Sequence, residues 1–259
     1  MLQRYAYPCR YVDMIKTFAR PVPQLCLITG QMTNHIYNMF SRLLTDLDQP
    51  WLSPVNLEKY AQAVFEKGAP LKNCWGFIDG TIRPVCRPQE NQQVLFNGHK
   101  RLHSIKFQSL VAANGMIANM YGPIEGRRHD NFMLRESGLL DQLQMSVDTN
   151  NEIMCIYGDP AYPIRPQLQA PFKGNLSPIE QDYNKAMSEV RVSVEWLFGD
   201  ILNYFKFTDF KKSQKVGMSA VGKMYLVSAL LQNAHTCLYR NTTCNYLELC
   251  PPKLYDYFQ

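Results

Sequence analysis

The chain has 259 residues, which is enough for one sizeable domain and a smaller module. Hydrophobic residues make up 46% of the chain and aromatic residues 12%, which indicates a globular core. Its 27 Lys and Arg against 22 Asp and Glu give a net charge of +5, compatible with an acidic or nucleic-acid partner without establishing one. The start, MLQRYAYPCRYVDM, lacks the apolar run of a signal peptide. No apolar stretch reaches the ~18–20 residues that span a membrane.

The eight cysteines form no CxxC pair and no Cys/His spacing typical of a zinc site. We therefore expect reduced thiols, which suit an intracellular compartment.

The first 70 residues are predicted to be helical, with helices at 11–20, 24–46 and 55–67. The short Pro turn between the first two fits a helix-turn-helix module and a plain helical hairpin equally well. A second helix that contacts DNA exposes polar residues near its N-terminus, and this one offers only Gln24, Gln31, Asn34 and His35.

From Asn73 onwards the pattern changes to strands. CWGFID (74–79) is a short apolar run that ends at Asp79, and the glycine after it is a turn signal. After an irregular basic stretch, strands at 104–113 and 116–124 flank Asn-Gly, a strong hairpin-turn signal.

A helix is predicted over 126–143, with Asp130 placed to cap it. The strand at 152–157 again leads to an acid, Asp159, and a Pro-rich loop over 160–176 follows.

A long helix is predicted over 177–201. Ser177 and Glu180 form a capping box, with Pro178 at the first helical position. Its apolar residues form one stripe, Tyr183, Met187, Val190, Val194, Leu197 and Ile201. A polar line, Asn184, Ser188, Arg191 and Glu195, runs along one edge of that stripe, although a helix that only needed solubility would place its charges on the far side.

The chain closes with a basic, aromatic stretch at 205–212, a last helix at 213–240 and a tail. The order of elements after residue 73 predicts an α/β (α+β) fold, a mixed sheet with helices packed on it. We expect a helical segment at 1–70, the sheet domain at 71–240 and the tail at 241–259.

Three acids occupy special positions: Asp79 and Asp159 at strand ends and Glu195 on the edge of the long helix. Strand ends and a flanking helix can converge on one point, and several carboxylates there suit Mg²⁺ or Mn²⁺. Taken singly, each acid has a plain structural interpretation. Asp-Gly and Gly-Asp-Pro are ordinary turn sequences, and Glu195 can pair with Arg191 one turn earlier. The three together, in this order, favour the metal site.

Four motifs, FIDGT (77–81), GRRHD (126–130), GDPAY (158–162) and YNKAMSEVRVSVEWLFG (183–199), resemble the DDE superfamily of transposases and derived endonucleases. The most similar branch is the PIF/Harbinger transposase-derived nucleases. The likeness covers roughly residues 73–235, and 35 residues separate Asp159 from Glu195. It implies an RNase H-like fold in which Asp79, Asp159 and Glu195 form the catalytic, metal-binding triad.

The resemblance implies metal-dependent cleavage of DNA phosphodiester bonds, with two Mg²⁺ or Mn²⁺ ions as cofactors. It also implies a nuclear location and a Myb/SANT-like protein partner. One alternative is a domesticated DNA-binding derivative without cleavage activity. A third possibility is an RNase H-like exonuclease unrelated to transposition, and the absence of the other motifs of such enzymes argues against it. The chain begins inside the N-terminal module expected for the family, so we expect a truncated N-terminus.

Further residues are candidates for supporting roles. Residues placed to orient the triad or touch DNA are His129, Asp130, Asn184 and Arg191. Candidates for phosphate contact are Lys100, Arg101, Lys106, Arg127, Arg128, Lys206, Lys211, Lys212 and Lys215. Two features depart from the family pattern: Arg127 and Arg128 fill a loop where small residues are usual, and Trp196 stands where a polar residue is expected.

Overall fold

The computed structural model describes residues 1–211 and 214–259. Within these residues six strands form one mixed sheet. The strands are β1 (Cys74–Pro84), β2 (Phe96–Asn97), β3 (Leu102–Ala112), β4 (Ile117–Glu125), β5 (Cys155–Tyr157) and β6 (Leu168–Gln169). Strand β3 pairs antiparallel with β1, β2 and β4, whereas β5 runs parallel to β1 and β6 runs parallel to β5. The predicted RNase H-like arrangement, a mixed sheet flanked by helices, is confirmed.

Strand β1 is longer than predicted, because it continues past Gly80 to Pro84 in unbroken antiparallel register with β3. Thr81 and Ile82 are β-branched residues that favour a strand. Position 80 requires a glycine even inside the strand, because a Cβ there would stand 2.1 Å from an Asp130 carboxylate oxygen. Asp79 is therefore not at the end of its own strand; it lies where the shorter neighbour β5 has already ended.

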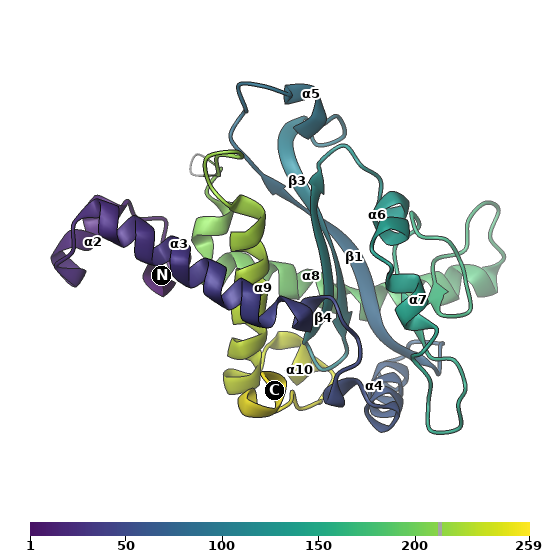
Figure 1. The fold of residues 1–259 in the computed structure, drawn as a ribbon. Coiled ribbons are helices and arrows are strands. Elements are labelled where there is room, and N and C mark those ends of the chain that lie inside the picture. Colours follow the sequence, from purple (N-terminus) through teal and green to yellow (C-terminus); the bar gives the residue numbers. More distant parts are fainter. Residues whose placement is uncertain (212–213) are drawn as a thin grey trace.

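Helices cover both sides of the sheet (Figure 1). Helices α8 (Pro178–Tyr204) and α9 (Val221–Tyr239) lie on one side, and α6 (Asp130–Glu136) and α7 (Leu139–Leu143) on the other. Helix α4 (Pro54–Glu66) packs where β1 begins, and the short α5 (Gln92–Leu95) lies at the opposite end of the sheet.

The predicted stripe of α8 forms part of the core. Val190, Val194 and Ile201 are at most 1% exposed. The helix begins as predicted: the Ser177 hydroxyl accepts from the Glu180 amide, and the Glu180 carboxylate accepts from the Ser177 amide. These reciprocal bonds satisfy two amides that a helix N-terminus otherwise leaves unpaired. The capping box thus fixes where the helix that carries Glu195 begins.

The N-terminal residues form α1 (Leu2–Ala6), α2 (Tyr11–Phe18) and α3 (Val22–Phe40), followed by 3-10 turns at Ser41–Leu44 and Pro50–Leu52. Helix α3 therefore ends six residues before the predicted Asp46. It packs against α9, where Lys223 Nζ donates to Asn34 Oδ1 at 2.8 Å and lies 4.9 Å from the ring centre of Tyr37.

Three other predictions differ from the structure. The single helix expected over 126–143 is divided into α6 and α7 by Gly138, which has a φ of +64°. The last long helix begins at Val221 rather than at 213, after a 3-10 turn at Lys206–Asp209. The expected tail carries α10 (Thr242–Tyr246) and α11 (Leu254–Tyr257), and Tyr257 is buried against α9, where Asn233 Nδ2 donates to its hydroxyl at 2.8 Å.

The C-terminal segment explains why a tryptophan stands at position 196, where a polar residue was expected. The Trp196 indole meets the ring of Tyr246 in α10 edge-on, with ring centres 5.3 Å apart. In the part of the chain that the structure describes, no helix has the length and apolarity needed to cross a membrane.

Candidate active site

Asp79 lies on the side of β1 that faces α8. Its side chain is 19% exposed, and its Oδ1 accepts from the Gly80 amide at 2.9 Å. Its Oδ2 lies 3.6 Å from Nη1 of Arg191 on α8. This carboxylate is therefore largely withdrawn from water and has one cationic neighbour.

Asp159 lies beside Asp79 because of the strand register. Strands β1 and β5 are parallel, with Phe77 opposite Tyr157. Asp79 and Asp159 each come two residues after this pair. Neighbouring strands are about 4.8 Å apart. The Asp159 side chain is half-buried, and its Oδ1 accepts from the Ala161 amide at 2.9 Å, a local turn that starts the loop after β5.

Glu195 reaches the same neighbourhood through Arg191. The two residues are one turn apart on α8, and Arg191 Nη2 lies 3.6 Å from Glu195 Oε1. Since Arg191 also lies 3.6 Å from Asp79, one guanidinium stands between two of the three predicted acids. The Glu195 side chain is 57% exposed, so it can turn away from this pairing.

Burial raises the pKa of Asp79 to about 6, from an ordinary value of 3.8. Arg191 and the Gly80 amide lower this pKa, while the nearby charges of Asp159 and Asp130 raise it. A carboxylate that is buried beside other carboxylates needs a compensating cation to ionise readily. Asp159 and Asp130 thus lie close enough to Asp79 to affect its ionisation.

The oxygen donors suit a hard divalent cation, but their present arrangement does not enclose one. Among the described residues no group of three or more His, Cys, Asp or Glu side chains is close enough to hold a metal ion. Asp79 and Asp159 adjoin through the strand register, whereas Glu195 is turned towards Arg191. As the described residues stand, the three predicted acids therefore do not form an enclosed cation site, and Glu195 pairs with Arg191 instead.

Asp130 has a different role from the predicted helix cap. The N-cap of α6 is His129, and Asp130 is the first helical residue. Its Oδ1 lies 2.9 Å from Lys106 Nζ on β3, and both side chains lie mostly out of solvent, at 18% and 11% exposed. A Cβ on Gly80 would meet both, so this ion pair occupies the side of β1 opposite Asp79.

Tyr162 is a site residue to which the sequence pattern assigned no role. It is 2% exposed, and its hydroxyl lies 3.5 Å from Gln108 Oε1 on β3. Burial raises its pKa, and the charges of Asp130, Asp79 and Asp159 raise it further. It is the last residue of the GDPAY motif, and its place in that motif was the one feature of the sequence that pointed to it.

The other two predicted supporting residues are Asn184 and His129. Asn184 binds the backbone of Phe172, accepting from its amide at 2.9 Å and donating to its carbonyl at 3.0 Å. At 1.5 Å per helical residue it is about 16 Å along α8 from Glu195. His129 is exposed at the start of α6.

The predicted phosphate contacts are spread over the surface. Lys100 and Arg101 are exposed in the turn between β2 and β3, Arg127 is exposed before α6, and Lys211 is exposed after the 3-10 turn. Arg128 is half-buried; its Nε donates to Glu125 Oε2 at 2.9 Å and its guanidinium lies 4.4 Å from the ring centre of Phe132. Lys212 lies outside the described residues.

The family model described as DDE superfamily endonuclease matches residues 78–233. The match begins one residue before Asp79 and includes Asp159 and Glu195. No curated protein and no solved structure shows a significant match to the chain.

Proposed function

Since the chain belongs to the DDE superfamily of endonucleases, we propose that it cleaves DNA phosphodiester bonds with Asp79, Asp159 and Glu195 as its catalytic, metal-binding triad. The observation that carries the proposal is that Asp79 on β1 and Asp159 just after β5 each lie two residues beyond the parallel pair Phe77–Tyr157, with the helix that bears Glu195 packed beside them. Two Mg²⁺ or Mn²⁺ ions would activate a water or a 3′-hydroxyl and stabilise the leaving oxygen there.

Each residue has a defined task in this proposal. Asp79, on β1 between the other two acids, would be one of the residues that hold the cations. Asp159 would hold them from the start of the loop after β5, and Glu195 would do so once it leaves Arg191. Arg191 holds Asp79 and Glu195 near each other until then, because its guanidinium has one nitrogen within 3.6 Å of each carboxylate.

The finer assignments form part of the same proposal. Membership of the PIF/Harbinger branch, nuclear location and a Myb/SANT-like partner follow from the resemblance of the four motifs. DNA contact by Lys100, Arg101, Arg127 and Lys211 is supported by their exposure and charge.

A second candidate is a DNA-binding derivative that has lost cleavage. The pairing of Arg191 with two of the three acids favours it, because a fixed cation there would neutralise the charge that attracts a metal ion. The two candidates differ in one observable, since both bind DNA and only the first breaks it.

The test is nicking of supercoiled plasmid DNA by the full chain in Mg²⁺ or Mn²⁺, with a gel-shift assay on the same samples. We expect relaxed plasmid to accumulate with either ion and cleavage to stop when EDTA is added. A DNA gel shift without nicking in either ion would support the DNA-binding derivative. Nicking that persists in EDTA would contradict the metal-dependent mechanism.

A further inference from the structure

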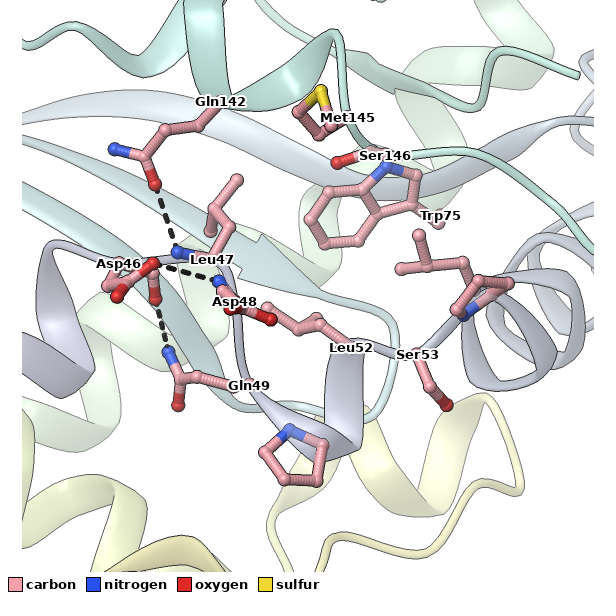
Figure 2. A pocket seen from close by; sticks show the side chains of 13 residues that line it. Asp46, Leu47, Asp48, Gln49, Leu52, Ser53, Trp75, Gln142, Met145 and Ser146 are labelled. Atoms are coloured by element: carbon pink, nitrogen blue, oxygen red, sulfur yellow. Dashed lines mark hydrogen bonds between the residues drawn. The ribbon is translucent and has the colours of Figure 1, made fainter. Parts of the chain in front are cut away.

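The cavity lined by Trp75 and by residues from 46–57 and 142–146, which we call the α4–α7 pocket, has a volume of about 810 Å³. It lies between the loop before α4, the end of α7 and the start of β1, and Figure 2 shows its lining. Its apolar wall includes Leu52, Leu57 and Trp75, which are at most 8% exposed. Pockets of about 300–1,000 Å³ are large enough to accept a ligand or several peptide side chains.

The pocket is lined by two acids, Asp46 and Asp48, and by no Lys, Arg or His, although the protein as a whole is basic. Residues 43–58 and 136–152 supply every lining residue except Trp75, and they contain no Lys, Arg or His. Of the acids in these two stretches, Asp46 and Asp48 line the pocket. Glu58 joins the two stretches, because its carboxylate accepts from the Thr149 amide at 2.7 Å.

One buried polar group in the wall has no partner. Trp75 is 0% exposed, and its indole Nε1 makes no hydrogen bond to any described residue. A β-bulge in the pairing of β1 with β5, between Cys74 and Gly76, sets the local backbone around it. The neighbouring Trp51 shows the usual arrangement, because its Nε1 donates to Gln49 Oε1 at 2.8 Å. A buried N–H without an acceptor costs about 1–3 kcal/mol, so an acceptor arriving from outside would relieve this cost.

The rim adds an adaptable apolar contact. Met145 is 81% exposed above the pocket (Figure 2). A flexible thioether suits contact with side chains of varied shape.

We propose that the α4–α7 pocket is a docking site for a basic peptide segment of a partner protein. An aliphatic or aromatic side chain of the peptide packs on Leu52, Leu57 and Met145. Flanking Lys or Arg side chains pair with Asp46 and Asp48, and a backbone carbonyl accepts from Trp75. DNA is not the occupant, because the carboxylates of Asp46 and Asp48 repel phosphates and no lining residue is a Lys, Arg or His. The site lies towards α4, away from α5 and from the basic turn before β3, so partner and DNA can bind together (Figure 1).

The test uses the full chain labelled with ¹⁵N-tryptophan and two capped peptides. One peptide has Leu and Trp flanked by Lys and Arg, and the other has Glu at each basic position. The three tryptophans give three indole N–H signals. We expect the basic peptide to shift the Trp75 signal and to leave the Trp196 signal unchanged, since Trp196 packs on Tyr246 at a distance from the pocket.

Two variants at exposed positions, Asp48→Lys and Met145→Lys, are each expected to weaken binding at least about tenfold. The control, Asp182→Lys, replaces an exposed acid on α8 and should bind as the unmodified protein does. Equal binding of the acidic peptide, unchanged binding by Asp48→Lys, or no shift at about 1 mM basic peptide would each overturn the proposal. A Trp75 shift that grows with protein concentration in the absence of peptide would overturn it in favour of a second copy of the chain.

Discussion

Replacing Asp159 by asparagine is expected to lower the rate of metal-dependent plasmid nicking more than about 100-fold. Changes to residues that only support a metal ligand typically cost about 10–100-fold, and Asp159 is proposed as a ligand itself. The amide keeps the size of the side chain and an oxygen that can accept from Ala161, so the loop after β5 should keep its shape. The loss should therefore come from the missing negative charge.

The matched control is Asp182→Asn, which removes one exposed charge from α8 at a distance from the acids. It should nick plasmid at the rate of the unmodified protein, and both variants should shift DNA in gels equally. If Asp159→Asn retained more than about a tenth of the activity, Asp159 would not be a ligand of a catalytic ion.

Replacing Asp79 by asparagine is expected to stabilise the metal-free protein near pH 8 by about 3 kcal/mol. The pKa of Asp79 is raised from 3.8 to about 6, and each pKa unit corresponds to about 1.36 kcal/mol. The raised pKa means that the folded state favours the neutral form of this carboxyl. The unmodified protein thus loses stability as pH rises from about 4 through 6. The asparagine variant does not lose this stability, because an amide does not ionise.

The measurement is denaturant unfolding of both proteins in EDTA across this pH range. The difference between them should be near zero below about pH 4, where the carboxyl is protonated in both states, and should level off above about pH 6. A variant that is equally or less stable at pH 8 would show that Arg191 compensates the Asp79 charge fully. Such a gain in stability on removing a functional group is expected where a site is arranged for binding rather than for folding.

Local patterns predicted α8 well because they depend on neighbours in the chain. The capping box at Ser177 and the stripe from Met187 to Ile201 are spaced by the helix itself, and both are confirmed. Gly80 shows the opposite case. As a turn signal it predicted the end of β1, but its lack of a side chain is needed to admit Asp130, which lies 50 residues later.

The contacts of the candidate site also divide into those that local sequence patterns predicted and those that they did not. Asp79 and Asp159 were predictable as neighbours because each follows an apolar strand run, and parallel pairing of β1 with β5 then aligns them. The pairing of Lys106 with Asp130 was not, because it joins a strand to a helix across the sheet and no local spacing records it. Pairing of Arg191 with Glu195 was the plain structural alternative in the sequence, and the second partner of Arg191, Asp79, became visible only when α8 was placed against the sheet.

The most direct test of the triad is a calorimetric titration of the full chain with Mn²⁺, beside the Asp159→Asn variant. The proposal predicts saturable binding by the unmodified protein and loss of that binding in the variant. It also predicts that affinity falls below about pH 6, because Asp79 must ionise to bind the metal. Absence of saturable binding, or equal binding by the variant, would contradict the assignment of Asp79, Asp159 and Glu195 as a metal-binding triad.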